Sequence, residues 1–188
     1  TIDANEFPTI QEAMPPDAFA VPTTQFASAL NAVTRSASKD DSRPTLTGIE
    51  FPVTENCIQM AATDGFRLTT VKIPVQTGKT GKTTLIIPAK NLDQIAKIAK
   101  GGAEQMHIAF TTNMFSAAIK AGDESGMTAL ISSGLLDAQY PNYHAIIPKG
   151  HKTRVALSAA KLATATRLAL LSAPKANSIA FNFSKAQL

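Results

Sequence analysis

The segment with the strongest chemical signature in this 188-residue sequence is residues 78–84, which end like a phosphate-binding loop. In such a loop a glycine stands five positions before the closing Gly-Lys-Thr, and the loop opens a helix whose amides hold phosphate. Gln76 occupies the glycine position here, and residues 84–88 have the composition of a strand. We therefore interpret residues 78–84 as a flexible basic hairpin loop, with a nucleotide-dependent enzyme as an alternative.

The other reactive side chains lack the spacing of a catalytic or metal site. His107, His144 and His151 show no ligand spacing among themselves or with Cys57. The acidic pairs at 40–41 and 123–124 are adjacent in sequence, so in a strand the two side chains of each pair would point to opposite faces. The sequence therefore predicts no metal, no cofactor and no enzyme active site.

Charge is distributed unevenly along the chain. The net charge is +4, with −6 in residues 1–64 and +10 in residues 65–188. A basic majority is typical of proteins with a polyanionic partner, although lysines that solvate an ordinary surface explain the same charge. One cysteine cannot form an internal disulfide, the first residues lack a signal-peptide layout, and no apolar run could span a bilayer. These features predict a cytoplasmic protein.

Hydrophobic periodicity predicts helices and short strands in a recurring order. Helices are expected from Thr23 or Thr24 as N-cap and over residues 89–100 and 158–172. Strands are expected at residues 49–53, 57–62, 71–75, 83–87, 106–110, 115–120, 127–132, 154–157 and 179–183. The helix starts are 66 and 69 residues apart, which indicates an internal repeat of one strand, one helix and three strands.

Three loop segments carry a more specific signal when they are taken together. They are residues 40–48 (DDSRPTLTG), 62–68 (ATDGFRL) and 136–148 (LDAQYPNYHAIIP). In this order and at these distances they resemble the SRPxLTG-like, ATDGxRL and LDGxFPDY…IP segments in the middle domain of bacterial beta sliding clamps. These clamps are the ring-shaped processivity factors of the replicative DNA polymerase.

The resemblance implies an α+β DNA-clamp fold, with helices on the inner face and antiparallel sheets outside. It implies that residues 1–17 end the first clamp domain and form a linker, that 18–150 form a complete middle domain, and that 151–188 begin a truncated third domain. It further implies a cytoplasmic, nucleoid-associated homodimer that encircles duplex DNA without reading its sequence, as a non-catalytic subunit of the polymerase holoenzyme.

The resemblance also assigns residues to two surfaces. A pocket for a linear peptide from the polymerase, the clamp loader and repair polymerases would include Leu46, Thr63, Gly65, Phe66, Arg67, Leu68, Pro141, Ala145 and Ile146. Phosphate-facing residues would be Arg35, Lys90, Lys97, Lys100 and Arg167. Phe66 stands where the family often has histidine. The alternative is a stand-alone interaction module that keeps the pocket but does not encircle DNA.

Overall fold

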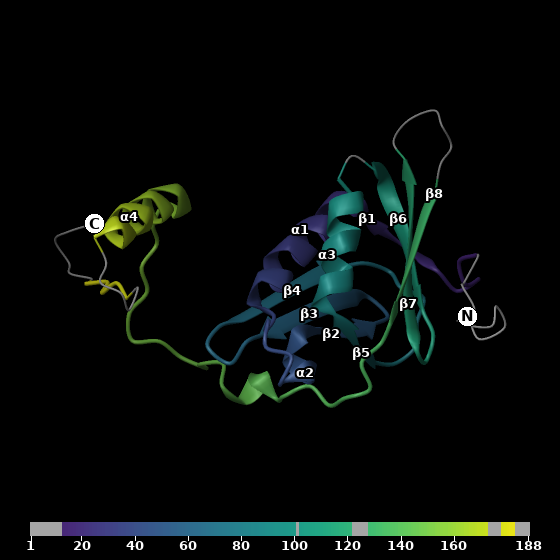
Figure 1. Cartoon of the computed structure of the whole chain (residues 1–188), viewed down its shortest axis with the longest axis horizontal. Helices are drawn as coiled ribbons and strands as arrows, with labels where there is room; N and C mark the ends of the chain where they lie inside the picture. The colour runs from purple at the N-terminus through teal and green to yellow at the C-terminus, as the bar shows by residue number, and fades with distance from the viewer. Residues whose placement is uncertain (1–12, 101, 122–127, 173–177, 183–188) are drawn as a thin grey trace, which may run out of the picture. The chain divides into compact units, whose positions relative to one another are not determined.

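The computed structural model describes residues 13–100, 102–121, 128–172 and 178–182 (Figure 1). The chain divides into two units, residues 1–143 and residues 144–188. Each unit is described by itself.

The first unit contains the same succession of elements twice, as the helix spacing predicts. The first half comprises β1 (Phe19–Pro22), α1 (Thr23–Val33), β2 (Gly48–Thr54), β3 (Cys57–Thr63) and β4 (Leu68–Pro74). The second half comprises β5 (Thr83–Pro88), α3 (Ala89–Ile98), β6 (Gly102–Phe110), β7 (Met114–Ala121) and β8 (Thr128–Gly134). Short helical turns η2 (Thr34–Ser36) and α2 (Pro44–Thr47) lie between α1 and β2. The predicted repeat is confirmed.

The two halves exchange their first strands. Sheet A has the order β1-β6-β7-β8 and sheet B the order β4-β3-β2-β5, and every pairing is antiparallel. Strand β1 of the first half therefore pairs with β6, where Phe19 lies opposite Ile108. Strand β5 of the second half pairs with β2, where Gly48 lies opposite Pro88. Neither half can leave the other without breaking a ladder of backbone hydrogen bonds.

This topology corrects the expectation of a hairpin loop at residues 78–84. Strands β4 and β5 are the two opposite edges of sheet B, so the segment between them crosses the sheet and does not close a hairpin. Within this crossover, Lys79 forms an ion pair with Asp17, and its ammonium lies 4.9 Å from the centre of the Phe110 ring.

The core lies between the helices and the two sheets. Helices α1 and α3 lie side by side (Figure 1), and α1 contacts strands of both sheets. Three phenylalanines join these layers: Phe26 of α1, Phe51 of β2 and Phe115 of β7. Their rings meet edge-on, with centroids 6.1 Å apart for Phe26–Phe51 and 5.6 Å apart for Phe51–Phe115.

Strand alternation gives sheet B a second packed face. In β2, Ile49, Phe51 and Val53 point into the main core, so the intervening Glu50 points to the outer face. A separate cluster forms on that outer face from Ala61, Ile86, Tyr140 and Tyr143, with Leu68 and Leu136 packed against it. We call the segment of residues 135–143 that supplies the two tyrosines the strap.

Both helices of the repeat begin directly after a proline. Pro22 and Pro88 are the N-cap residues of α1 and α3, and neither helix has a side-chain cap. The prediction that Thr23 or Thr24 caps α1 is therefore wrong. Thr23 is already the first helical residue, and its buried Oγ1 atom has no partner among the described residues. Proline ends the strand because it lacks the N–H that a ladder needs, and the helix follows at once.

In the second unit, α4 (Ala159–Leu171) confirms the predicted third helix, and the Ser158 hydroxyl accepts a hydrogen bond from the Lys161 amide at 3.4 Å. The strand predicted at 154–157 is wrong, and so is the strand predicted at 179–183 over residues 179–182; Phe183 lies outside the described residues. A strand needs a hydrogen-bonded neighbour, and the described residues of this unit offer none. No residue of α4 is buried, and Leu171 is 83% exposed.

No helix in the described ranges is both long enough and apolar enough to cross a membrane.

The aromatic contact between the layers can be tested by truncating Phe51, whose ring is fully buried. We expect Phe51→Ala to lower the free energy of unfolding by about 3–5 kcal/mol, because the mutation leaves a cavity between Phe26 and Phe115. Urea denaturation followed by circular dichroism measures this change. The control is Phe66→Ala, which removes a ring that is 96% exposed and is expected to change stability by less than ~0.5 kcal/mol. Equal effects of the two variants would contradict the assignment of the core.

Candidate functional site

The turn between β3 and β4 is held by side chains of its own sequence. The Thr63 hydroxyl accepts a hydrogen bond from the Gly65 amide at 3.1 Å and donates one to the Arg67 carbonyl at 2.7 Å. Gly65 has a φ of 94°, a left-handed conformation that side chains other than glycine's disfavour. The residues ATDGFRL therefore specify one fixed turn between the two strands.

Asp64 fixes the tip of this turn. Its Oδ1 atom accepts hydrogen bonds from the amides of Phe66 and Arg67, both at 3.0 Å, and its Oδ2 atom lies 2.9 Å from Nε of Arg67. These two backbone hydrogen bonds, with a smaller contribution from the Arg67 guanidinium, lower the pKa of Asp64 below its ordinary value. The ordered tip leaves the Phe66 ring 96% exposed.

The strap crosses the outer face of sheet B and contacts this turn. The Leu136 amide donates to the Ile86 carbonyl of β5 at 2.8 Å, and the Tyr140 hydroxyl accepts from the Thr63 amide at 3.1 Å. The rings of Tyr140 and Tyr143 meet edge-on at 6.3 Å. One hydrogen bond, from Thr63 to Tyr140, thus joins the strap to the residue that orders the turn.

Side chains of β5 and of the strap pack closely over Gly48. A Cβ atom on Gly48 would lie 2.6 Å from Cγ2 of Ile86 and 2.9 Å from Cδ1 of Leu136. Both distances are shorter than carbon atoms tolerate, so any larger residue would displace the Ile86 and Leu136 side chains. Glycine therefore gives the strap room to pack at the start of β2.

Tyr143 is the second anchor of the strap and is 2% exposed. Its hydroxyl accepts a hydrogen bond from Nε2 of Gln59 at 3.2 Å. Burial, together with the neighbouring Glu50 carboxylate, raises the pKa of Tyr143. Burial is also the main cause of the raised pKa of Tyr140. Both phenols are therefore neutral at pH 7 and can donate a hydrogen bond.

The structure brings together most, but not all, of the predicted pocket residues. Thr63, Gly65, Phe66, Arg67 and Leu68 form the turn and the start of β4, and Pro141 lies exposed between the two tyrosines of the strap. Leu46 is half-buried in α2, and the neighbouring Arg43 reaches toward the turn, with its Nη1 atom 3.5 Å from where a Cβ of Gly65 would stand. Ala145 and Ile146 belong to the second unit and are exposed there, Ile146 to 71%.

Sequence reasoning missed four residues that fix this surface: Tyr140, Tyr143, Glu50 and Gln59. The tyrosines offered a signal, since they are the only two in the sequence and flank Pro141. Glu50 and Gln59 offered none, because a polar residue at the outward position of a strand is the ordinary pattern.

The predicted phosphate-facing residues divide between the two units. Arg35 in η2, Lys90 and Lys97 in α3 and Lys100 just after α3 are all exposed. Lys97 is partly neutralised by Asp93, with Nζ and Oδ2 2.7 Å apart. Asp93 is the only acidic residue in residues 23–36 and 89–100, so the paired helices present an excess of positive charge. Arg167 is exposed in α4 of the second unit.

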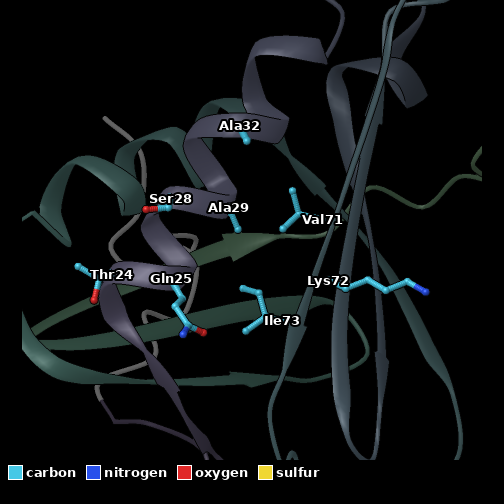
Figure 2. Close-up of a pocket in the computed structure, with 8 residues that line it drawn as sticks. All are labelled: Thr24, Gln25, Ser28, Ala29, Ala32, Val71, Lys72 and Ile73. Atoms are coloured by element: carbon cyan, nitrogen blue, oxygen red, sulfur yellow. The ribbon is translucent and has the colours of Figure 1, made fainter. Parts of the chain in front are cut away.

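A cavity of about 470 Å³ lies apart from both surfaces, between α1 and the edge strand β4 (Figure 2). The small residues Ser28, Ala29 and Ala32 line its helical side, and Val71, Lys72 and Ile73 line the strand side. Figure 2 shows the Lys72 side chain extending away from α1. None of its lining residues belongs to the predicted pocket.

The described residues hold no group of three or more His, Cys, Asp or Glu that could bind a metal ion. The segment at 78–84 leads into β5 and not into a helix, so it lacks the helix N-terminus of a phosphate-binding loop.

A duplicated strand–helix–three-strand unit with exchanged first strands, helices on one side and antiparallel sheets on the other, defines the DNA-clamp fold. Comparison with known proteins agrees with this class. The family model described as DNA polymerase III beta subunit, central domain, matches residues 20–142. The chain belongs to the DNA polymerase III beta subunit family, the bacterial beta sliding clamps.

Individual relatives match over most of this chain and only part of their own length. The beta sliding clamp of Halalkalibacterium halodurans is 28% identical over 181 residues, which is 95% of this chain and 46% of that protein. The beta sliding clamp of Micrococcus luteus is 28% identical over 190 residues, 100% of this chain and 59% of that protein. The chain thus spans about half the length of the curated relatives it matches.

Solved structures agree with the fold. The DNA polymerase sliding clamp of Bacillus subtilis superposes with a TM-score of 0.77 at 26% identity, covering 93% of this chain and 44% of that one. The beta subunit of DNA polymerase III from Thermotoga maritima superposes with a TM-score of 0.72 at 21% identity, covering 89% and 44%.

The carboxylate of Asp64 gives the turn a testable pH dependence. Its pKa is lowered in the folded state, so its contribution to stability is present above the ordinary value of 3.8 and is lost as the pH falls through the lower folded value. We expect the amide signals of Phe66 and Arg67 to shift with a midpoint below 3.8 in an NMR titration. Asp64→Asn should abolish that titration, and a midpoint above 3.8 in the unmodified protein would contradict the turn geometry.

Proposed function

We propose that the protein is a DNA polymerase processivity factor: a ring-shaped homodimeric clamp that encircles duplex DNA and tethers the replicative polymerase through a peptide-binding pocket. The observation that carries this proposal is the match of residues 20–142 to the central domain of the DNA polymerase III beta subunit. That span contains the turn, nearly all of the strap and both helices of the repeat. The clamp itself would be non-catalytic and would act in the cytoplasm, on nucleoid DNA.

The proposal divides the chain as the resemblance implies. Residues 1–17 would end the first clamp domain, residues 18–150 would form the complete middle domain, and residues 151–188 would begin the third. The exposed leucines of α4 support this division, because in a longer third domain they would be buried by further elements.

The helix surface suits a partner that is bound without sequence recognition. Arg35, Lys90 and Lys100 are exposed long cationic side chains, which contact phosphates but reach no base edge from outside a groove. A ring that carries such side chains holds DNA loosely, and it slides because the contacts are the same at every position. Arg167 in α4 would contact phosphates in the same way.

The turn and the strap suit a short peptide with apolar anchors. Leu46, Leu68, Pro141 and Ile146 would supply apolar surface for leucine or phenylalanine side chains of the polymerase, the clamp loader or a repair polymerase. Arg67, whose side chain is 63% exposed, would donate hydrogen bonds to peptide carbonyls. The exposed Phe66 ring and Ala145 would lie at the edge of the pocket and favour an apolar neighbour there.

Peptide binding is tested with Leu68→Asp in the intact protein. We expect affinity for a fluorescein-labelled peptide with leucine and phenylalanine anchors to fall by at least about 10-fold, because a carboxylate would replace apolar contact surface. Fluorescence anisotropy measures the change. The matched control is Ile98→Asp, which places the same charge at a partly exposed apolar position of α3. Unchanged binding by Leu68→Asp would refute the pocket.

Encirclement of DNA is tested by reversing charge on the helices. We expect Lys90→Glu combined with Lys100→Glu to shorten retention of the intact clamp on circular duplex DNA. The slope of log affinity against log salt should also become shallower, by about 0.9 for each phosphate that the protein no longer neutralises. Lys97→Ala should have a smaller effect, because Asp93 already neutralises that lysine.

The control for charge reversal is Lys82→Glu, compared with Lys90→Glu alone, because it reverses one charge in the crossover segment, outside the helices. Sedimentation of the intact protein separates the proposal from its alternative: a stand-alone interaction module would be a monomer with unaltered peptide binding. Unchanged DNA retention after the double reversal would refute the assignment of the helix surface.

A further inference from the structure

The Glu50 carboxylate lies among apolar residues on the outer face of sheet B. In the ladders of sheet B, Glu50 is opposite Ala61 on one side and Ile86 on the other, and both neighbours belong to the outer-face cluster. Its Oε2 atom is buried and accepts no hydrogen bond from the described residues. Burial of a carboxylate is unfavourable unless hydrogen bonds compensate it. Tyr143 belongs to the same outer-face cluster, and the Glu50 carboxylate is near enough to its hydroxyl to raise the pKa of the phenol.

Tyr143 lies between a donor and an acceptor on neighbouring strands. Gln59 of β3 donates a hydrogen bond to the Tyr143 hydroxyl oxygen, and that hydroxyl has a proton of its own to donate. The buried Oε2 atom of Glu50, on the same face of β2, is an acceptor with no partner among the described residues. A hydrogen bond from Tyr143 to Glu50 satisfies this acceptor and gives one order of donation: Gln59 to Tyr143 to Glu50. An order of this kind fixes the ring in one orientation, which packing of the ring alone would not.

Two attachments hold the strap on either side of Pro141. The Tyr140 hydroxyl ties the strap to the turn through the Thr63 amide, and the Tyr143 amide closes a turn on the Pro141 carbonyl at 2.8 Å. Pro141, itself exposed, is carried between these two attachments. Its position therefore depends on how firmly Tyr143 is held.

We propose that Glu50 is a positioning residue for the peptide pocket. It accepts a hydrogen bond from the Tyr143 hydroxyl and thereby fixes the position of the strap. Pro141 of the strap and Leu68 then offer apolar surface to one anchor side chain of the peptide. This inference rests on the proposed function for the identity of the ligand. Glu50 touches no ligand in this scheme. It raises affinity by ordering the pocket wall before binding, so that the peptide does not have to order it.

The experiment compares two replacements of Glu50 in the intact protein. Glu50→Gln keeps an oxygen that accepts from Tyr143, whereas Glu50→Leu keeps a similar volume and removes the acceptor. We expect Glu50→Leu to weaken binding of the fluorescein-labelled leucine-phenylalanine peptide about 3- to 10-fold, the range of one hydrogen bond. Glu50→Gln should stay within about 2-fold of the unmodified protein, because the acceptor is kept.

Tyr143→Phe completes the test as a double-mutant cycle. It should weaken peptide binding at least as much as Glu50→Leu, because it also removes the acceptor of the Gln59 hydrogen bond. The effects of the two substitutions should not add in the double variant, because the bond between Tyr143 and Glu50 can be lost only once. Additive losses would overturn the proposal. Asn91→Ala is the matched control, since it removes a 2.8 Å side-chain hydrogen bond to Ser133 elsewhere in the unit and should leave peptide affinity unchanged.

Hydrogen exchange measures the strap without any peptide. The Leu136 and Tyr143 amides, which donate to Ile86 and Pro141, should exchange faster in Glu50→Leu than in Glu50→Gln. If the unmodified protein fails to bind the peptide while this difference is seen, the proposed ligand is wrong and the positioning by Glu50 stands. If both replacements exchange alike, or if Glu50→Leu only lowers the melting temperature with affinity unchanged, Glu50 has no positioning role.

Discussion

The exchange of first strands is the constraint on which the rest of this structure depends. A lone half would leave a three-stranded sheet whose edge at β2 or at β6 has no partner, and unpaired edges in small sheets are unstable and prone to aggregation. The first half supplies β1 to sheet A and the second half supplies β5 to sheet B, so each half completes the sheet of the other. The hydrogen bonds of two ladders therefore hold together distant parts of the sequence, since Phe19 lies opposite Ile108 and Gly48 lies opposite Pro88.

The exchange of first strands also determines which residues lie on each face of sheet B. Because β5 pairs with β2, Ile86 lies opposite Glu50 on the outer face, while Leu85 and Ile87 turn into the core beside Phe51. The strap then follows β8 and hydrogen bonds to β5 through Leu136, so the second half of the repeat covers the sheet of the first. The candidate pocket wall is thus a product of both halves, assembled on a surface that neither would make alone.

Local sequence patterns predicted the helices and strands of the first unit well, but they did not predict which strands pair with each other. Apolar stripes placed α3 within two residues of its observed end, and period-two alternation placed the inward residues of β2. The strand exchange was not predictable, because residues 83–87 would have the same pattern whether they paired with β4 or with β2. The same limit explains the missed hydrogen bond from Gln59 to Tyr143, which joins residues 84 positions apart. The strand expected at 154–157 failed for the complementary reason: the pattern is present, and the described neighbours supply no ladder.

Period two also separates the chemistry of the two candidate surfaces. Residues that point from sheet B toward α1 and α3 build the core under the basic helices, and residues that point the other way build the floor under the strap. A substitution at Phe51 therefore acts on the stability of the whole unit, whereas a substitution at Glu50, one residue earlier, acts first on the outer face. The adjacent residues of a single strand belong to different surfaces, so stability and partner binding can vary nearly independently in this fold. Conversely, a shift of one residue in the register of β2 would turn Phe51 to the outer face and Glu50 toward the core. Such a shift would disrupt both the core and the outer-face cluster.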